Sequence, residues 1–340
     1  MTNPPALRTA THVAFDSATT ERLLQLGATS VVRASDRLVI GPSRRDPSEH
    51  ARARAAWWKS SEKWDRLYAP DVRWEPPVVV WVAASIHERV NLWRTLTWLR
   101  RSGLSYRDIF ILELDRVAPS GAPEEPMPPY DCTSSVADHT DEVLLERLAT
   151  ARPWPLARHD RAVALWERYS DLNPLRFARS CVRGMRGFPE LGPLWAFLSS
   201  LFPRSTPDGS LRLSRLDELL LTLLSGEWQT PVALFVHKSE PGAALRHLVS
   251  CTGDLFLPRR LDQWAAHGPS GAVERTAGPK PPDHPLLSSS YRITARGMRL
   301  REIGLEQLSD APGLPVAGIE AYAPSAPWVV AEDGRLSRQP

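Results

Sequence analysis

The chain has 340 residues and a formal net charge of +3, a length that allows two or three domains with ordinary cores. The small net charge gives no bulk electrostatic reason to expect an acidic partner. No apolar run approaches the roughly 20 residues of a membrane-spanning helix, and residues 1–15 contain no apolar signal core. We therefore expect a cytoplasmic protein that does not span a membrane.

The first third of the chain alternates short apolar runs with helical patterns. Residues 11–15 (THVAF) and 30–33 (SVVR) predict strands, and residues 17–26 between them predict a helix that stops at Gly27. Residues 48–68 form a long segment rich in Arg and Trp, which also predicts a helix. This order indicates layers of strands and helices.

The stretch from residue 77 to 115 carries the strongest pattern. Residues 78–82 (VVVWV) and 109–114 (IFILEL) are apolar on both faces, as parallel strands covered on both sides are. The helix expected between them begins after Ser85, whose spacing to Glu88 matches a capping box, and Gly103 can end it.

These patterns predict a Rossmann-like α/β domain over residues 8–116, with a parallel sheet and helices on both faces. Residues 117–135 are rich in Pro, Gly and acid and predict a linker or long loop. A helical region follows over residues 136–210. Residues 211–335 predict a winged-helix-like domain, because helices at 214–224, 230–237 and 254–266 precede a hairpin whose second strand is YRIT at 291–294.

Several short motifs, taken in order, resemble a bacterial family of uncharacterised proteins known as domain of unknown function 1835. The motifs are THVAFDSA near the start, DRLVIGP at 36–42, VWVAASIHERVNLWRTL at 80–96, SRLDELLLTLL at 214–224, GDLFL at 253–257 and YRITARG at 291–297. The family often has a Gly shortly after the Asp-Ser-Ala, where this chain has Thr19 and Thr20. The resemblance implies an architecture, with a second uncharacterised region after the α/β domain, and no established activity.

Ligands of parallel α/β sheets bind beyond the carboxyl ends of the strands. Asp16 and Ser17 follow the first expected strand, where they could hold a phosphate or ribose or could simply cap the helix. Asp36 and Gly41 could lie at the binding edge, or could form a tight turn in which Gly41 relieves backbone strain. We favour capping and the turn for these two pairs.

Ser85, Glu88 and Arg89 follow the next expected strand and are the candidate site we favour most. Glu88 could act as a general base, or could bind a ligand hydroxyl while Arg89 holds an anion. The capping box explains Ser85 and Glu88 without any ligand, and we expect His87 to lie in solvent.

Two features allow a nucleic-acid partner, although we do not favour one. Seven of the 13 tryptophans lie between residues 57 and 98 among basic side chains, and could stack bases or simply fill the core. Arg259 and Arg260 could contact DNA if the third helix of the winged-helix-like domain were exposed. However, residues 214–300 carry 10 basic and 8 acidic side chains, a net of only +2, whereas DNA-binding modules show a clearer basic surface.

No nucleotide-loop, metal-ligand or hydrolase motif is present, so the sequence predicts no cofactor and no metal. Our leading hypothesis is a ligand-binding or protein-interaction module with a small polar or anionic ligand at the strand ends. The alternatives are an enzyme acting on a nucleotide or phosphorylated metabolite, with Glu88 as the catalytic candidate, and a winged-helix DNA-binding regulator.

Overall fold

The computed structural model describes residues 5–58, 66–67, 69, 72–117, 130–266, 271–322 and 328–338. Contacts divide the chain into two compact units, one of Met1–Phe177 with Arg183–Pro193 and the other of Ala178–Val182 with Leu194–Pro340. The helical region expected over residues 136–210 is thus distributed over both units, which are described separately below.

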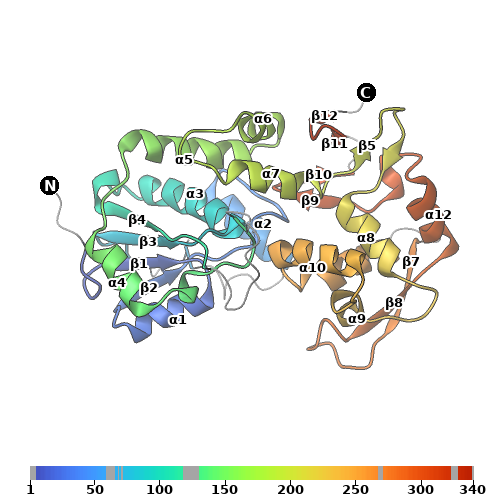
Figure 1. Ribbon diagram of the computed structural model, residues 1–340, viewed down its shortest axis with the longest axis horizontal. Helices are drawn as coiled ribbons and strands as arrows, with labels where there is room; N and C mark the ends of the chain where they lie inside the picture. The colour runs from blue at the N-terminus through green and yellow to red at the C-terminus, as the bar shows by residue number, and fades with distance from the viewer. Residues whose placement is uncertain are drawn as a thin grey trace. The chain divides into compact units, whose positions relative to one another are not determined.

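The first unit is built on a four-stranded sheet in the order β2-β1-β3-β4, with every neighbouring pair parallel (Figure 1). The strands are β1 (Thr11–Ala14), β2 (Ser30–Arg33), β3 (Val78–Val82) and β4 (Ile109–Glu113). All four agree with the sequence prediction to within one residue. The Val- and Ile-rich runs of β3 and β4 are buried on both faces, as expected, whereas β2 is partly exposed. The α/β class of this unit is therefore confirmed.

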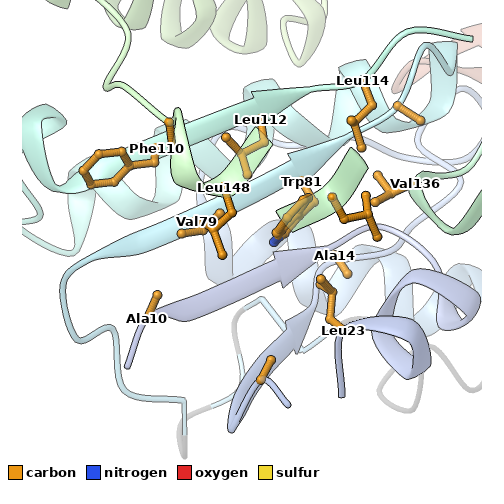
Figure 2. Close-up of a cluster of buried hydrophobic side chains, with 14 residues drawn as sticks. Ala10, Ala14, Leu23, Val79, Trp81, Phe110, Leu112, Leu114, Val136 and Leu148 are labelled. Atoms are coloured by element: carbon orange, nitrogen blue, oxygen red, sulfur yellow. The ribbon is translucent and has the colours of Figure 1, made fainter. Parts of the chain in front are cut away.

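Helices cover both faces of this sheet (Figure 1). One face packs against α1 (Ser17–Gln25) and α4 (Asp141–Ala149), as Figure 2 shows for Leu23 near Ala14 and Leu148 near Val79. The other face packs against α3 (Ile86–Arg101), which is covered in turn by α5 (Leu156–Tyr169). Because α3 lies between the sheet and α5, 13 of its 16 residues are buried, including charged ones.

Helix α2 (Pro47–Trp58) is the described part of the helix expected over 48–68; residues 59–65 and 68 lie outside the described residues. Trp81 and Trp93 are core residues, at 1% and 0% exposure, and Trp58 donates a hydrogen bond to Asp36. These tryptophans support packing over base stacking. Most of the expected linker, residues 118–129, also lies outside the described part of the chain.

Two helices, α6 (Leu175–Arg183) and α7 (Leu191–Ser199), contain the residues at which the chain passes between the units. The second unit contains four helices followed by an antiparallel hairpin of β7 (Val273–Ala277) and β8 (Ser289–Ile293). Its helices are α8 (Arg215–Leu223), α9 (Pro231–Phe235), α10 (Glu240–Thr252) and α11 (Phe256–Ala266), with α12 (Ala295–Ile303) after the hairpin. We did not expect α10 from the sequence.

Short strands complete the second unit. A four-stranded sheet has the order β12-β11-β5-β6, and β9 pairs with β10 in a second hairpin. The bounds are β5 (Arg204–Ser205), β6 (Leu211–Arg212), β9 (Leu314–Val316), β10 (Ile319–Ala321), β11 (Trp328–Ala331) and β12 (Leu336–Arg338). Ser214 caps α8, since its Oγ accepts the N–H of Asp217 at 3.1 Å.

Candidate functional site

The carboxyl ends of the four parallel strands lie at one edge of the sheet, as predicted. The chain runs from β1 to β2 on one side and then to β3 on the other, so the strand order reverses between β1 and β3. In sheets of this kind ligands bind outside such a reversal point. Asp16 follows β1 here, Ser85 and Glu88 follow β3, and Glu113 ends β4.

Asp16 caps helix α1, which confirms the capping role. Its Oδ1 accepts the N–H of Thr19 at 2.6 Å, and its Oδ2 accepts the hydroxyls of Thr19 at 2.7 Å and of Ser135 at 3.0 Å. Ser17 is exposed beside it. These donors engage both oxygens of Asp16, so the carboxylate already serves a structural role.

Glu88 is 2% exposed and lies against the end of β3. Its Oε2 accepts the N–H of Ala83 at 2.6 Å, and it shares a hydrogen bond with Asp16. Burial, together with the nearby charge of Asp16, raises the pKa of Glu88 well above its usual value, although the Ala83 N–H acts in the opposite direction. Glu88 is therefore suited to hold a proton between two carboxyl groups.

The capping box expected at the start of α3 is wrong. Within the described part of the chain, Ser85 makes no side-chain hydrogen bond there, and Glu88 turns back to Ala83 instead. The N–H of Ile86 donates to the carbonyl oxygen of Asp131 at 2.8 Å, so a distant segment pairs a first-turn N–H that the box itself would have left open. The expectation that His87 lies in solvent is also wrong. It is 6% exposed, and burial lowers its pKa well below the usual value.

Replacing Glu88 by Gln should stabilise the protein increasingly as pH rises. The pKa of Glu88 is raised in the folded protein. Its contribution to the free energy of unfolding is therefore fully present below the unfolded-state pKa of about 4.5 and is lost as pH rises through the folded-state pKa. Each unit of the increase corresponds to about 1.4 kcal/mol. Gln can accept from Ala83 and donate to Asp16 at every pH. Urea unfolding between about pH 5 and 9 should show a growing advantage of Glu88→Gln, and none for exposed Glu146→Gln. A pH-independent difference would contradict the assignment.

A second group of charged side chains lies at the ends of β3 and β4. Arg89 Nη1 donates to Glu113 Oε1, and Arg158 of α5 binds both oxygens of the same carboxylate, at 2.8 and 3.0 Å. The Arg89 guanidinium lies 5.4 Å from the ring centre of Tyr130. Glu190 is close enough for its charge to raise the pKa of Arg89. We call Arg89, Glu113, Tyr130, Arg158 and Glu190 the strand-end cluster.

Three buried polar atoms of the strand-end cluster have no hydrogen-bond partner among the described residues. They are Nε of Arg89, Nε of Arg158 and Oε2 of Glu190. Arg89 and Glu190 are 4% and 2% exposed. Buried polar groups of folded proteins are normally paired with protein, water or ligand, and an unpaired one costs roughly 1–3 kcal/mol. The cluster therefore offers two donors and one acceptor to a small polar molecule.

Asp36, the remaining acidic candidate, belongs to a separate interior network. Its carboxylate forms a two-point ion pair with Arg54, and its backbone oxygen accepts from Asn91 at 2.8 Å. Burial alone would raise the pKa of Asp36, but the charges and hydrogen bonds of Arg54, with a contribution from Arg94, lower it to about 2. This carboxylate is thus ionised and already paired with Arg54.

Gly41 has the backbone role expected of a turn. Its φ is +78°, and an added Cβ would lie 2.4 Å from Nη1 of Arg54 and 2.7 Å from Nε1 of Trp57. A side chain would therefore disturb the Arg54 ion pair as well as strain the backbone. Asp36 and Gly41 together build the interior beside β2 rather than an open binding edge.

Arg260 does not present a charge to a nucleic acid. Its side chain is 0% exposed, and its Nε and Nη2 donate to the Asp217 carboxylate at 2.7 and 2.8 Å. Arg259 beside it is half-buried. The hairpin is no more basic, since Arg292 pairs with Glu274 at 2.6 Å and Arg275 with Asp262 at 3.0 Å. The idea that Arg260 contacts DNA is therefore wrong.

The sequence reasoning missed four members of the strand-end cluster. Glu113 had a signal, because it is a charged residue at the end of the apolar run IFILEL. Tyr130, Arg158 and Glu190 had none, since only the fold brings these separated positions to the sheet edge. Ser85, Glu88 and Arg89 do lie at that edge, as predicted.

Among the described residues, no group of His, Cys, Asp and Glu is arranged to hold a metal ion. In the same part of the chain, no helix combines the length and apolar character needed to cross a bilayer. Comparison with models of known protein families gave no match, and searches of curated proteins and of solved structures gave none. The resemblance to domain of unknown function 1835 thus rests on the quoted motifs alone.

Proposed function

We propose that the first unit binds a small polar or anionic molecule at the carboxyl ends of β3 and β4, without transforming it. The observation that supports this most is the set of unpartnered buried atoms in the strand-end cluster, on Arg89, Arg158 and Glu190. Their position at the strand ends is where α/β sheets hold ligands. Binding in a bacterial cytoplasm, in a protein related to domain of unknown function 1835, is the setting we propose.

A thermal-shift screen of inorganic phosphate, nucleotides and sugar phosphates on the full-length protein tests this function. A ligand that binds only the folded state raises the melting temperature, by an amount that grows with concentration. Arg89→Lys should weaken the apparent affinity for the ligand at least tenfold and so reduce the shift in melting temperature. The reason is that Lys cannot supply the Nε–H while keeping the bond to Glu113. Arg161→Lys, an exposed change on the same helix as Arg158, should leave it unchanged. Ligand-dependent shifts that survive Arg89→Lys would refute the assigned position.

A second candidate function is supported by the proton that Glu88 can hold beside Asp16. A carboxyl group of raised pKa at a strand end is suited to general acid–base chemistry. The unit would then be an enzyme acting on a nucleotide or phosphorylated metabolite, with Glu88 as base and Arg89 as anion clamp. Consumption of a screened metabolite, abolished in Glu88→Gln, would establish this function in place of simple binding. Full activity in Glu88→Gln would exclude Glu88 as the base.

For the second unit we propose a winged-helix-like domain that docks a protein partner. The order of α8, α9 and α11 before the β7–β8 hairpin supports it, with α10 as an added helix. The paired charges of the hairpin and the buried Arg260 favour a protein over DNA. Binding to duplex DNA that weakens steeply with salt would instead establish a DNA-binding regulator.

A further inference from the structure

The strand-end cluster contains unused hydrogen-bonding groups of opposite kinds. Arg89 and Arg158 each have a buried Nε–H without a partner, and Glu190 has a buried carboxyl oxygen without one. The Nη groups of Arg158 are already used by the Glu113 carboxylate, and one of Arg89 is as well. A molecule that satisfied all three atoms would supply acceptors to the two Nε–H groups and a donor to Glu190.

The charges of the cluster point to the same class of molecule. Arg89 and Arg158 contribute two positive charges beside the carboxyl groups of Glu113 and Glu190; burial raises the pKa of Glu190, while the charge of Arg89 favours its ionised form. A simple anion would add an uncompensated charge beside the Glu190 oxygen, which is costly where solvent is excluded. A molecule that carries its own ammonium or hydroxyl group avoids that cost.

We propose that the strand-end cluster selects small molecules that join an oxyanion, either a phosphate or a carboxylate, to an ammonium or hydroxyl donor. The oxyanion binds Nε–H of Arg89 and Arg158, and the donor binds Glu190 Oε2. This inference rests on the proposed binding function and specifies its ligand class. Trp154, whose ring centre lies 3.7 Å from the Arg158 guanidinium, holds that arginine in place by stacking.

Calorimetric titration of the full-length protein with two matched pairs of probes tests the ligand class. Phosphoethanolamine and ethyl phosphate share a phosphate, and only the first has an ammonium. β-Alanine and propionate make the same comparison for a carboxylate. We expect the ammonium member of at least one pair to bind tenfold or more tightly than its partner, and the pair that shows this identifies the oxyanion.

The preference should depend on Glu190 and on no other carboxylate. In Glu190→Gln the ratio within the pair should fall below about threefold, since the charge that attracts the ammonium is gone; a tenfold ratio corresponds to about 1.4 kcal/mol. If Glu190→Gln does not fold, Glu190→Asp is the alternative variant. Its shorter side chain keeps the carboxyl group but moves it away from the ligand, so the affinity ratio should also fall. Glu146→Gln, exposed on α4, should leave it unchanged.

The outcomes separate the ligand class from the binding function. Equal binding of both members of each pair, a preference that survives in Glu190→Gln, or no binding of any of the four probes would overturn the ligand class. In the first two cases, loss of binding in Arg89→Lys would still support the proposed function. In the third case, the thermal-shift screen of phosphate, nucleotides and sugar phosphates tests the binding function independently, through the effect of Arg89→Lys on the melting-temperature shifts.

Discussion

Replacing Asp217 by Asn should destabilise the second unit by about 3–5 kcal/mol, the usual effect of removing one partner of a buried ion pair. Asp217 and Arg260 are both 0% exposed. The carboxylate also accepts Nε1–H of Trp264 and the hydroxyl of Tyr322, each at 2.8 Å. Asn would turn an amide N–H₂ toward these donors and leave the guanidinium without its counter-charge.

Urea unfolding followed by circular dichroism measures the loss, and the neighbouring residue is its control. Glu218 binds Arg204 and Arg215 at distances of 2.9 and 2.8 Å, but all three side chains are about a third or more exposed. Glu218→Gln should therefore cost less than about 1 kcal/mol. The paired change Asp217→Leu with Arg260→Met should recover only part of the stability, because it removes the buried charges but also the acceptor of Trp264 Nε1–H and the Tyr322 hydroxyl. Equal losses for Asp217→Asn and Glu218→Gln would show that burial of this pair has been misjudged.

The first unit was the more predictable part of the chain, and its strands show why. Residues 78–82 are a short apolar run that follows two prolines, and residues 109–114 are a second such run, so composition and length indicated the same element. Gly103 has a positive φ of +86° just after α3, as a helix-ending glycine requires. These signals act between near neighbours in the sequence, and a single sequence contains them in full.

Errors arose where local spacing or composition gave a misleading signal. Ser85 and Glu88 have the spacing of a capping box, but the Asp131 carbonyl oxygen accepts the N–H of Ile86, and Glu88 is drawn to Ala83. Helix α10, which contains Pro241 and Gly242 near its start, was not expected from the sequence. In the structure both lie in the first turn of α10, where Pro is tolerated.

The position of the candidate site could be predicted from the sequence, but the interactions of its side chains could not. Parallel strands place their ends together whatever follows them, so Glu88 and Arg89 were expected at the right edge. What each side chain does there depends on its partner. Arg89 finds Glu113 and Glu190, 24 and 101 positions away in the chain, and no local pattern encodes such pairs.

The buried ion pair of Asp36 allows the same test of stability in the first unit. Here the pH dependence of unfolding reports on the protonation of a single carboxylate. Asp36→Asn should cost about 3–5 kcal/mol near neutral pH, because Arg54, which is 2% exposed, would lose the carboxylate of its two-point ion pair. Asp160→Asn, which alters an exposed pair with Arg100, should cost less than about 1 kcal/mol.

The difference between wild type and Asp36→Asn should shrink as the solution is acidified. The pKa of Asp36 is lowered in the folded protein from 3.8 to about 2, so its contribution is fully present above the unfolded value and is lost as pH falls through the folded one. That lowering corresponds to about 2 kcal/mol. Urea unfolding of both proteins between about pH 6 and 2 measures it, because groups common to both cancel in the difference. A difference that stays constant down to about pH 2 would mean that Arg54 does not hold Asp36 ionised, and the interior beside β2 would then be maintained by packing around Gly41 rather than by charge.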